Sequence, residues 1–142
     1  MKIMSLFGAV WVGLLLSDFA GAHGEDKPGP NQGHVQMPGA FHTELVLEAD
    51  QSVRVYLIDI EFKNPTVKDS SVELRYKDGK DIIPFKCAPM GTDHFHCFTR
   101  KKYSLKKGEL LVQATREKAL GNLATYKLPL KISPAADHKM HD

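Results

Sequence analysis

One stretch of the sequence, residues 85–98 (FKCAPMGTDHFHCF), concentrates the side chains with the clearest chemistry. It contains both cysteines of the chain, one methionine and two histidines. Thioether sulfur is a soft ligand that suits Cu(I), and imidazole suits Cu(II), zinc and nickel. The stretch could therefore hold a metal ion, and its cysteines could either ligate that ion or form a structural disulfide.

Methionine and histidine also occur together elsewhere in the chain. Beyond residue 22, every methionine (Met37, Met90 and Met140) lies within five residues of a histidine. These methionines fall in expected loops, whereas core methionines would lie on the apolar side of strands. In an oxidising compartment, this combination can bind copper without an oxidisable thiol. The candidate ligands of a copper ion are His23, His34, Met37 and His42, with Met90, His94 and His96 as a second or a joint cluster.

Residues 85–98 are expected to form an antiparallel hairpin in which Cys87 lies opposite Cys97. This register leaves residues 91–93 as a three-residue loop, which is a usual hairpin length. Because side chains alternate between the two faces of a strand, the register divides the residues into two groups. The apolar group, expected in the core, comprises Ile83, Phe85, Cys87, Phe95 and Cys97. The group expected to point outward, or toward the N-terminal segment, comprises Met90, His94, His96 and Phe98.

The two cysteines are interpreted as a disulfide rather than as thiolate ligands, because the chain begins with features of an export signal. A bridge between Cys87 and Cys97 would close a loop of about eleven residues and stabilise the fold by about 2.5–3 kcal/mol. The alternative, in which both thiolates ligate a metal with Met90 or a histidine, stays open on the sequence alone. Pro89 cannot donate to a ladder, which predicts an edge strand or a bulge near the tip.

The first 22 residues have the features of a secretory signal peptide. Lys2 supplies a positive charge, Phe7–Leu16 is apolar, and Ala20-Gly21-Ala22 matches the small-x-small cleavage pattern. The mature chain would then start at His23, whose α-amino group and Nδ1 could chelate one metal ion together. No other stretch approaches the roughly 20 apolar residues of a membrane span. We therefore expect a periplasmic protein with no membrane span after cleavage.

Residues 41–132 are expected to form one β-sandwich domain. Turn signals such as Asp78-Gly79 separate short, often alternating apolar segments about every ten residues. Seven short strands spaced in this way predict an all-β, immunoglobulin-like antiparallel sandwich. The expected strands are residues 41–49, 52–62, 70–77, 81–87, 94–100, 109–115 and 124–132. Residues 23–40, which are rich in Gly, Pro and His, are expected to be a flexible arm, residues 115–122 a helix or loop, and residues 133–142 a disordered tail.

Charge and motifs argue against several classes of function. The chain has 19 Lys and Arg against 17 Asp and Glu, and the basic residues look scattered, so a nucleic-acid partner is not expected. Ser70 and Ser71 lack the surroundings of a catalytic nucleophile, and there is no glycine-rich phosphate loop. Asp59 and Glu61 lie on an expected strand without an evident partner for acid–base chemistry. We therefore expect that the protein is not an enzyme.

The start of the predicted mature chain resembles small exported bacterial proteins that handle copper and other heavy metals. It is also similar to the N-terminal segment of periplasmic adaptor subunits of metal-efflux pumps, which carry a Gly-Pro-His-Gly-Gly-type motif before a Phe-x-x-Glu-Leu strand. The matching residues are 29–34 (GPNQGH) and Phe41–Leu45, with Asn31 where the motif has histidine and His34 three positions later. An N-terminal histidine on a β-sandwich also resembles copper-resistance proteins of the CopC type.

The resemblance implies a periplasmic β-sandwich linked to metal efflux or resistance, with an efflux-pump component as a partner. Together with the ligand pattern, it predicts a periplasmic metal-binding protein that carries or buffers copper. The alternative is a non-enzymatic β-sandwich interaction module that docks on an exported or envelope partner. In that case the histidines are incidental and no specific metal is bound.

Overall fold

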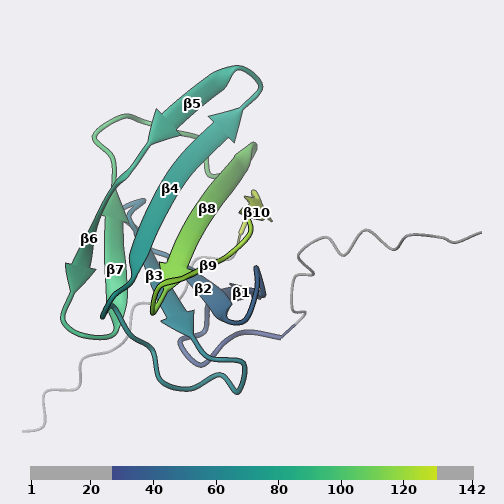
Figure 1. Ribbon diagram of the computed structural model, residues 1–142. Helices are drawn as coiled ribbons and strands as arrows, with labels where there is room; N and C mark the ends of the chain where they lie inside the picture. The colour runs from purple at the N-terminus through teal and green to yellow at the C-terminus, as the bar shows by residue number, and fades with distance from the viewer. Residues whose placement is uncertain (1–26, 131–142) are drawn as a thin grey trace, which may run out of the picture.

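The computed structural model describes residues 27–130, which form two antiparallel β-sheets and contain no helix (Figure 1). The expected signal peptide, its cleavage site, His23 and the expected C-terminal tail lie outside the described residues. The prediction of an all-β antiparallel sandwich is confirmed. Residues 27–130 contain ten strands rather than the seven expected, and the three additional strands are described below.

The strands are divided between the two sheets as follows. The first sheet has the order β1 (His34–Gln36), β2 (His42–Leu47), β3 (Val53–Ile58), β7 (His94–Phe98) and β6 (Lys86–Met90). The second sheet has the order β10 (Ala124–Lys127), β8 (Glu109–Arg116), β4 (Ser71–Asp78) and β5 (Asp81–Pro84), with β9 (Ala119–Leu120) also paired to β8.

This strand order is that of an immunoglobulin-type sandwich. In that fold one sheet has the order A-B-E-D and the other contains C, F and G. Strands β2, β3, β7 and β6 take the places of A, B, E and D, and strands β4, β8 and β10 take those of C, F and G. Strand β1 extends the first sheet beside β2, and β5 extends the second beside β4.

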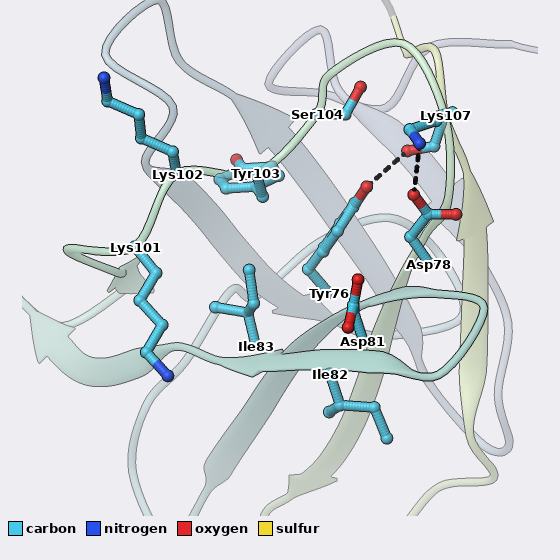
Figure 2. A pocket seen from close by; sticks show the side chains of 10 residues that line it. All are labelled: Tyr76, Asp78, Asp81, Ile82, Ile83, Lys101, Lys102, Tyr103, Ser104 and Lys107. Atoms are coloured by element: carbon cyan, nitrogen blue, oxygen red, sulfur yellow. Dashed lines mark hydrogen bonds and ion pairs between the residues drawn. The ribbon is translucent and has the colours of Figure 1, made fainter.

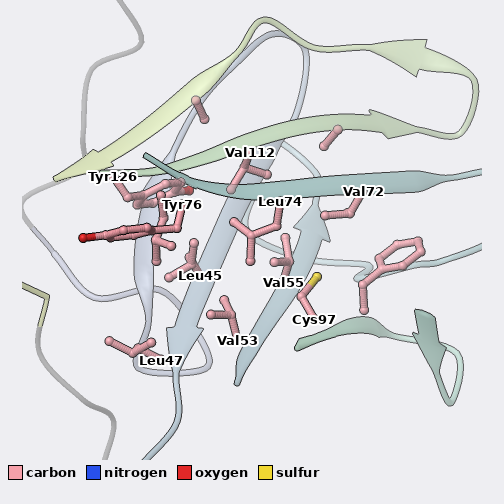
Figure 3. Close-up of a cluster of buried hydrophobic side chains, with 14 of the residues drawn as sticks. Leu45, Leu47, Val53, Val55, Val72, Leu74, Tyr76, Cys97, Val112 and Tyr126 are labelled. Atoms are coloured by element: carbon pink, nitrogen blue, oxygen red, sulfur yellow. The ribbon is translucent and has the colours of Figure 1, made fainter. Parts of the chain in front are cut away.

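The core lies between the two sheets and follows from the alternation of side chains along the strands (Figure 3). In β4, Val72, Leu74 and Tyr76 are buried, while the residues between them are exposed. The central strands β2 and β3 are buried on almost every residue, because their outer face is covered too. On that outer face, Val46, Tyr56 and Ile58 form a second, smaller buried cluster.

The expected flexible arm is, over the residues described, partly built into the sandwich. Residues His34–Gln36 form β1, which pairs antiparallel with β2. The side-chain amide of Gln36 donates to the carbonyl oxygen of Thr125 (2.5 Å), so this edge also contacts β10 in the second sheet. A three-residue strand between glycine and proline has too short a pattern to be recognised from alternation.

A buried carboxylate holds the turn that precedes β1. Glu44 has no exposed surface, and its Oε1 accepts hydrogen bonds from the backbone N–H groups of Asn31 (2.8 Å) and Gly33 (2.9 Å). The side-chain amide of Asn31 donates to Oε2 (2.9 Å). A Cβ atom on Gly33 would come within 2.7 Å of the carbonyl oxygen of Leu45, so only glycine fits this approach. Residues 29–33 (GPNQG) and 41–45 (FHTEL), the two parts of the N-terminal segment that resembles metal-handling proteins, therefore pack on each other.

The other two differences concern strand boundaries. The expected strand 81–87 changes sheet at Phe85, whose N–H donates to the carbonyl oxygen of Leu74 (2.9 Å) while Lys86 already belongs to β6. Residues 115–122, expected to be a helix or loop, complete a short hairpin between β8 and β9. Its two turn residues, Glu117 and Lys118, both have positive φ (47° and 70°), as a type I′ turn requires.

Candidate functional site

The hairpin of β6 and β7 has the predicted register. Cys87 lies opposite Cys97, and Met90 lies opposite His94. The two sulfur atoms are bonded (2.04 Å), so both cysteines belong to a disulfide and the thiolate alternative does not apply to this structure. Strand β6 lies at the edge of its sheet, which confirms the expectation drawn from Pro89.

The two faces of the hairpin also divide as predicted. Phe95 and Cys97 are buried in the core, and the remaining apolar members of that group pack against it: Ile83, Phe85 and Cys87. On the opposite face lie Met90, His94 and His96, which we call the hairpin trio. This face is the outer face of the first sheet, so the trio lies away from the core.

His94 is held in one orientation by its neighbours. Its Nδ1–H donates to Oδ1 of Asp93 (2.7 Å), and its ring lies against the ring of Tyr56, with centroids 5.0 Å apart. The imidazole can use only one nitrogen in this bond, so Nε2 is left to accept a proton or a metal ion. A carboxylate on one ring nitrogen and a metal on the other is the usual arrangement of metal-bound histidines.

The other two members of the trio flank His94. Met90 is 49% exposed and lies directly across the hairpin from it. His96 lies two residues further along β7, between Ala88 and Arg54 of the adjacent strands, and its ring stacks on that of Phe98 at 6.0 Å. Arg54 is bonded to Glu48, so its positive charge is already paired.

The candidate ligands outside the hairpin are not gathered in the same way. His42 is buried (3% exposed), donates from Nδ1 to the carbonyl oxygen of Asp59 (2.9 Å) and stacks on Phe62, with centroids 4.1 Å apart. His34 lies opposite Leu45, a core residue, and therefore on the other face of the sheet from His42. Met37 follows β1 and is 42% exposed.

The structure thus brings together three of the six described candidate ligands. Within residues 27–130, no three His, Cys, Asp or Glu side chains form a group that could hold a metal ion. The hairpin trio reaches three donors only when the thioether of Met90 is included. A soft ion that accepts thioether sulfur fits this donor set better than a hard one.

Some of the residues around the trio were not identified from the sequence. Asp93 was included only in the hairpin loop, although a carboxylate next to a histidine is a signal that could have been used. Tyr56 was recognised only as part of a strand, because its contact with His94 depends on the pairing of β3 with β7. Electrostatics around His96 extend to Asp50, whose pKa is lowered mainly by hydrogen bonds from Ser52, with a smaller contribution from His96.

The basic residues are less scattered than expected. The connection from β7 to β8, residues 99–108, contains no acidic residue. Its five cationic residues, all exposed, are Arg100, Lys101, Lys102, Lys106 and Lys107. We call this connection the cationic loop. It lies at the end of the sandwich opposite the tip of the β6–β7 hairpin (Figure 1).

Comparison with protein-family models, curated proteins and solved structures gives no match for this chain. The resemblance to metal-handling proteins therefore stays a prediction. No helix within residues 27–130 is long and apolar enough to cross a membrane.

Proposed function

We propose that this protein binds a copper ion through Met90, His94 and His96, and that it carries or buffers copper in the periplasm. The observation that carries the proposal is the position of the three side chains on one face of a disulfide-closed hairpin, with the Nδ1 of His94 bonded to Asp93. The periplasmic location and the link to metal efflux rest on the N-terminal sequence and its resemblance.

The spacing of the trio suits a single ion. Directly opposed residues in an antiparallel pair have Cβ atoms about 5 Å apart, and alternate residues of one strand are about 6.5 Å apart. Met90 and His94 have the first relationship, and His94 and His96 have the second. Side chains of this length can converge on one ion above the sheet. One thioether and two imidazoles provide ligands for Cu(I), the state that thioether sulfur favours.

The disulfide gives the hairpin its role in this proposal. It removes both thiols from coordination chemistry, so the site does not depend on a reduced cysteine. It also joins β6 to β7 three residues from Met90, which limits separation of the strands that carry the ligands. A site held in place before the ion arrives loses less conformational entropy on binding.

Exposure of Met90 supports a carrier or buffer rather than a permanent metal centre. A three-ligand site at the surface leaves a side from which a ligand of another protein can approach the ion. Such exchange through a shared ion would let copper pass to an efflux component without release into solution. The protein's own contribution is to bind and orient the ion.

The test is an anaerobic titration of the purified, disulfide-intact protein with Cu(I), in competition with a chromophoric Cu(I) chelator. We expect Met90→Leu and the double variant His94→Gln/His96→Gln each to weaken binding by more than the ~10–100-fold typical of losing an outer-shell partner. The matched controls are His34→Gln and Met37→Leu, which remove the same donor types from β1 and its end. They should leave the affinity unchanged.

Equal affinities for the hairpin variants and the wild-type protein would contradict the proposal. Losses confined to His34→Gln and Met37→Leu would instead place copper near the N-terminal segment. A third outcome would favour the alternative function, a docking module without a metal. In that case the protein would bind Cu(I) and Cu(II) no more tightly than a free histidine-containing peptide does.

A further inference from the structure

The cationic loop is rigidly attached to the core although it has no regular secondary structure. Tyr103, in its middle, is buried, and its ring packs against those of Tyr76 (5.1 Å) and Phe85 (5.2 Å). Its hydroxyl donates to the carbonyl oxygen of Gln51 (2.6 Å). The hydroxyl of Tyr76 donates to the carbonyl oxygen of Lys107 (3.1 Å), which fixes the end of the loop (Figure 2).

Anchoring of the loop leaves its cationic side chains directed to solvent. Figure 2 shows Lys101 and Lys102 extending away from the buried Tyr103. Among the described residues, only Lys107 of the five cations forms an ion pair, with Asp78 (2.9 Å). That contact raises the pKa of Lys107. Four positive charges at this end of the sandwich are therefore not neutralised by a salt bridge from the described residues.

Exposed apolar side chains lie beside these charges. Ile82, at the start of edge strand β5, is 53% exposed and lines a cleft of about 400 Å³ together with Lys101 and Lys102. Phe98, at the end of β7, is 38% exposed and lines a second cleft of about 300 Å³ with Lys86 and Arg100. The first cleft is also lined by the carboxylate of Asp81, which forms no ion pair with Lys107.

We propose that this end of the sandwich docks on the surface of a bilayer containing anionic lipids. Cationic residues would lie at the level of the lipid phosphates, and Ile82, which lines the same cleft as Lys101 and Lys102, would enter the boundary between headgroups and acyl chains. Basic residues next to exposed apolar ones are the combination that interfacial binding uses. Nucleic acid is less favoured, because single strands require several aromatic faces for stacking, and among the described residues Phe98 is the one exposed aromatic side chain at this end.

The inference is independent of the copper proposal. The cationic loop follows the C-terminal end of β7, whereas Met90 and His94 lie at the tip of the hairpin. His96 lies between them, and its ring stacks on that of Phe98, but none of Lys101, Lys102 and Ile82 belongs to the hairpin trio. A molecule bound through the loop would keep the hairpin tip directed away from the lipid surface (Figure 1). Loss of vesicle binding in variants of Lys101, Lys102 or Ile82 should therefore leave Cu(I) binding intact.

The experiment is co-sedimentation of the full purified protein with vesicles of phosphatidylglycerol and phosphatidylcholine, and with vesicles of phosphatidylcholine alone. We expect binding to the anionic vesicles only. The double variant Lys101→Gln/Lys102→Gln should bind about 25-fold more weakly, because each basic residue near an anionic surface contributes about fivefold. Lys63→Gln/Lys68→Gln is the matched control, since both lysines are exposed in the β3–β4 connection at the opposite end, and it should bind as the wild-type protein does.

A third variant separates lipid from other polyanions. Ile82→Ser keeps every charge, and it should weaken vesicle binding severalfold while leaving retention on immobilised heparin unchanged. Thermal unfolding of each variant checks that the fold is intact. Any of three results would overturn the proposal. The two lysine double variants could lose vesicle binding equally, or Ile82→Ser could bind vesicles as the wild-type protein does. The protein could also bind a duplex oligonucleotide or an acidic peptide more tightly than vesicles.

Discussion

At the scale of single residues, the fold depends on several polar groups whose partners are distant in sequence. Glu44 accepts hydrogen bonds from Asn31 and Gly33, and the hydroxyls of Thr43 and Tyr126 are bonded to each other across the two sheets (2.6 Å). Within residues 27–130, every buried side-chain nitrogen or oxygen has a hydrogen-bond partner. Such groups stabilise the fold only when paired, so removing one partner leaves the other unsatisfied.

Replacement of Gly33 by alanine should destabilise the protein. The new Cβ would lie 2.7 Å from the backbone oxygen of Leu45, which cannot rotate away, and 2.9 Å from the Cγ of Glu44. We expect a loss of about 2 kcal/mol in the free energy of unfolding, within the range of overpacked sites. Gly39→Ala is the control, because its nearest neighbour outside the local chain is 3.6 Å away. Urea unfolding measures both, and equal effects would contradict the proposed close packing.

Replacement of Asp93 by asparagine tests the orientation of His94. The amide cannot accept the Nδ1–H bond as strongly as the carboxylate does. We expect Asp93→Asn to lower Cu(I) affinity by ~10–100-fold, as for other outer-shell partners of metal-bound histidines. Asp69→Asn removes the same charge at the same end of the molecule and should leave the affinity unchanged. Chelator competition gives both values, and equal losses would point to a simple charge effect.

At the scale of elements, the hairpin of β6 and β7 could be predicted to the level of individual pairs. Two cysteines ten residues apart can lie directly opposite each other in a hairpin with a three-residue loop, and this pairing fixes which of the remaining residues oppose each other. The faces then followed from the alternation of side chains. The position of His34 could not be derived in this way, because it depends on the pairing of the short strand β1 with β2.

Other elements were hidden because their signal lies elsewhere in the chain. The arm was judged by its own Gly and Pro content, whereas its turn is held by Glu44, more than ten residues later. The change of sheet at Phe85 depends on its bond to Leu74, and the alternation of residues 81–87 carries no trace of it. The clustering of cations was visible in the sequence, but the role of Tyr103 as their anchor depends on three other segments.

Removal of the disulfide should affect both the stability of the hairpin and its ion binding. The double variant Cys87→Ala/Cys97→Ala should lose about 2.5–3 kcal/mol in the free energy of unfolding, from the entropy of the unfolded chain. It should also bind Cu(I) more weakly, because β6 is an edge strand held on one side only. Urea unfolding and chelator competition measure the two effects. Unchanged Cu(I) affinity in the folded variant would show that the trio does not need the bridge.

At the scale of the whole molecule, the two ends of the sandwich differ in chemistry. One end carries the hairpin tip and the β3–β4 connection, where Val67 donates to the carbonyl oxygen of Thr92 (3.2 Å). The other end carries the cationic loop and the turns around Gln51 and Gly79. Separate functions at the two ends would allow the protein to hold an ion at one and a surface at the other.

The stability of the whole fold should fall in alkaline solution, because Tyr103 must stay neutral in the core. Burial raises the pKa of Tyr103 to about 12. An unfolded tyrosine ionises near pH 10, so its contribution is fully present below that pH and is lost as the pH rises toward 12. Urea unfolding across this interval should show a decrease that is smaller for Tyr103→Phe. An identical pH dependence in the variant would contradict this assignment.

The short sequence separation of the two cysteines has a consequence for how the chain reaches its native state. Strand β7 also pairs with β3, about forty residues earlier, and such distant contacts form slowly because a long loop must close first. Closure of the β6–β7 hairpin involves only neighbouring residues and can precede it. With two cysteines in the chain, oxidation has one intramolecular product. The bridge can therefore form on a still unfolded chain, and no reshuffling of wrong pairs within that chain is needed before the sandwich assembles around it.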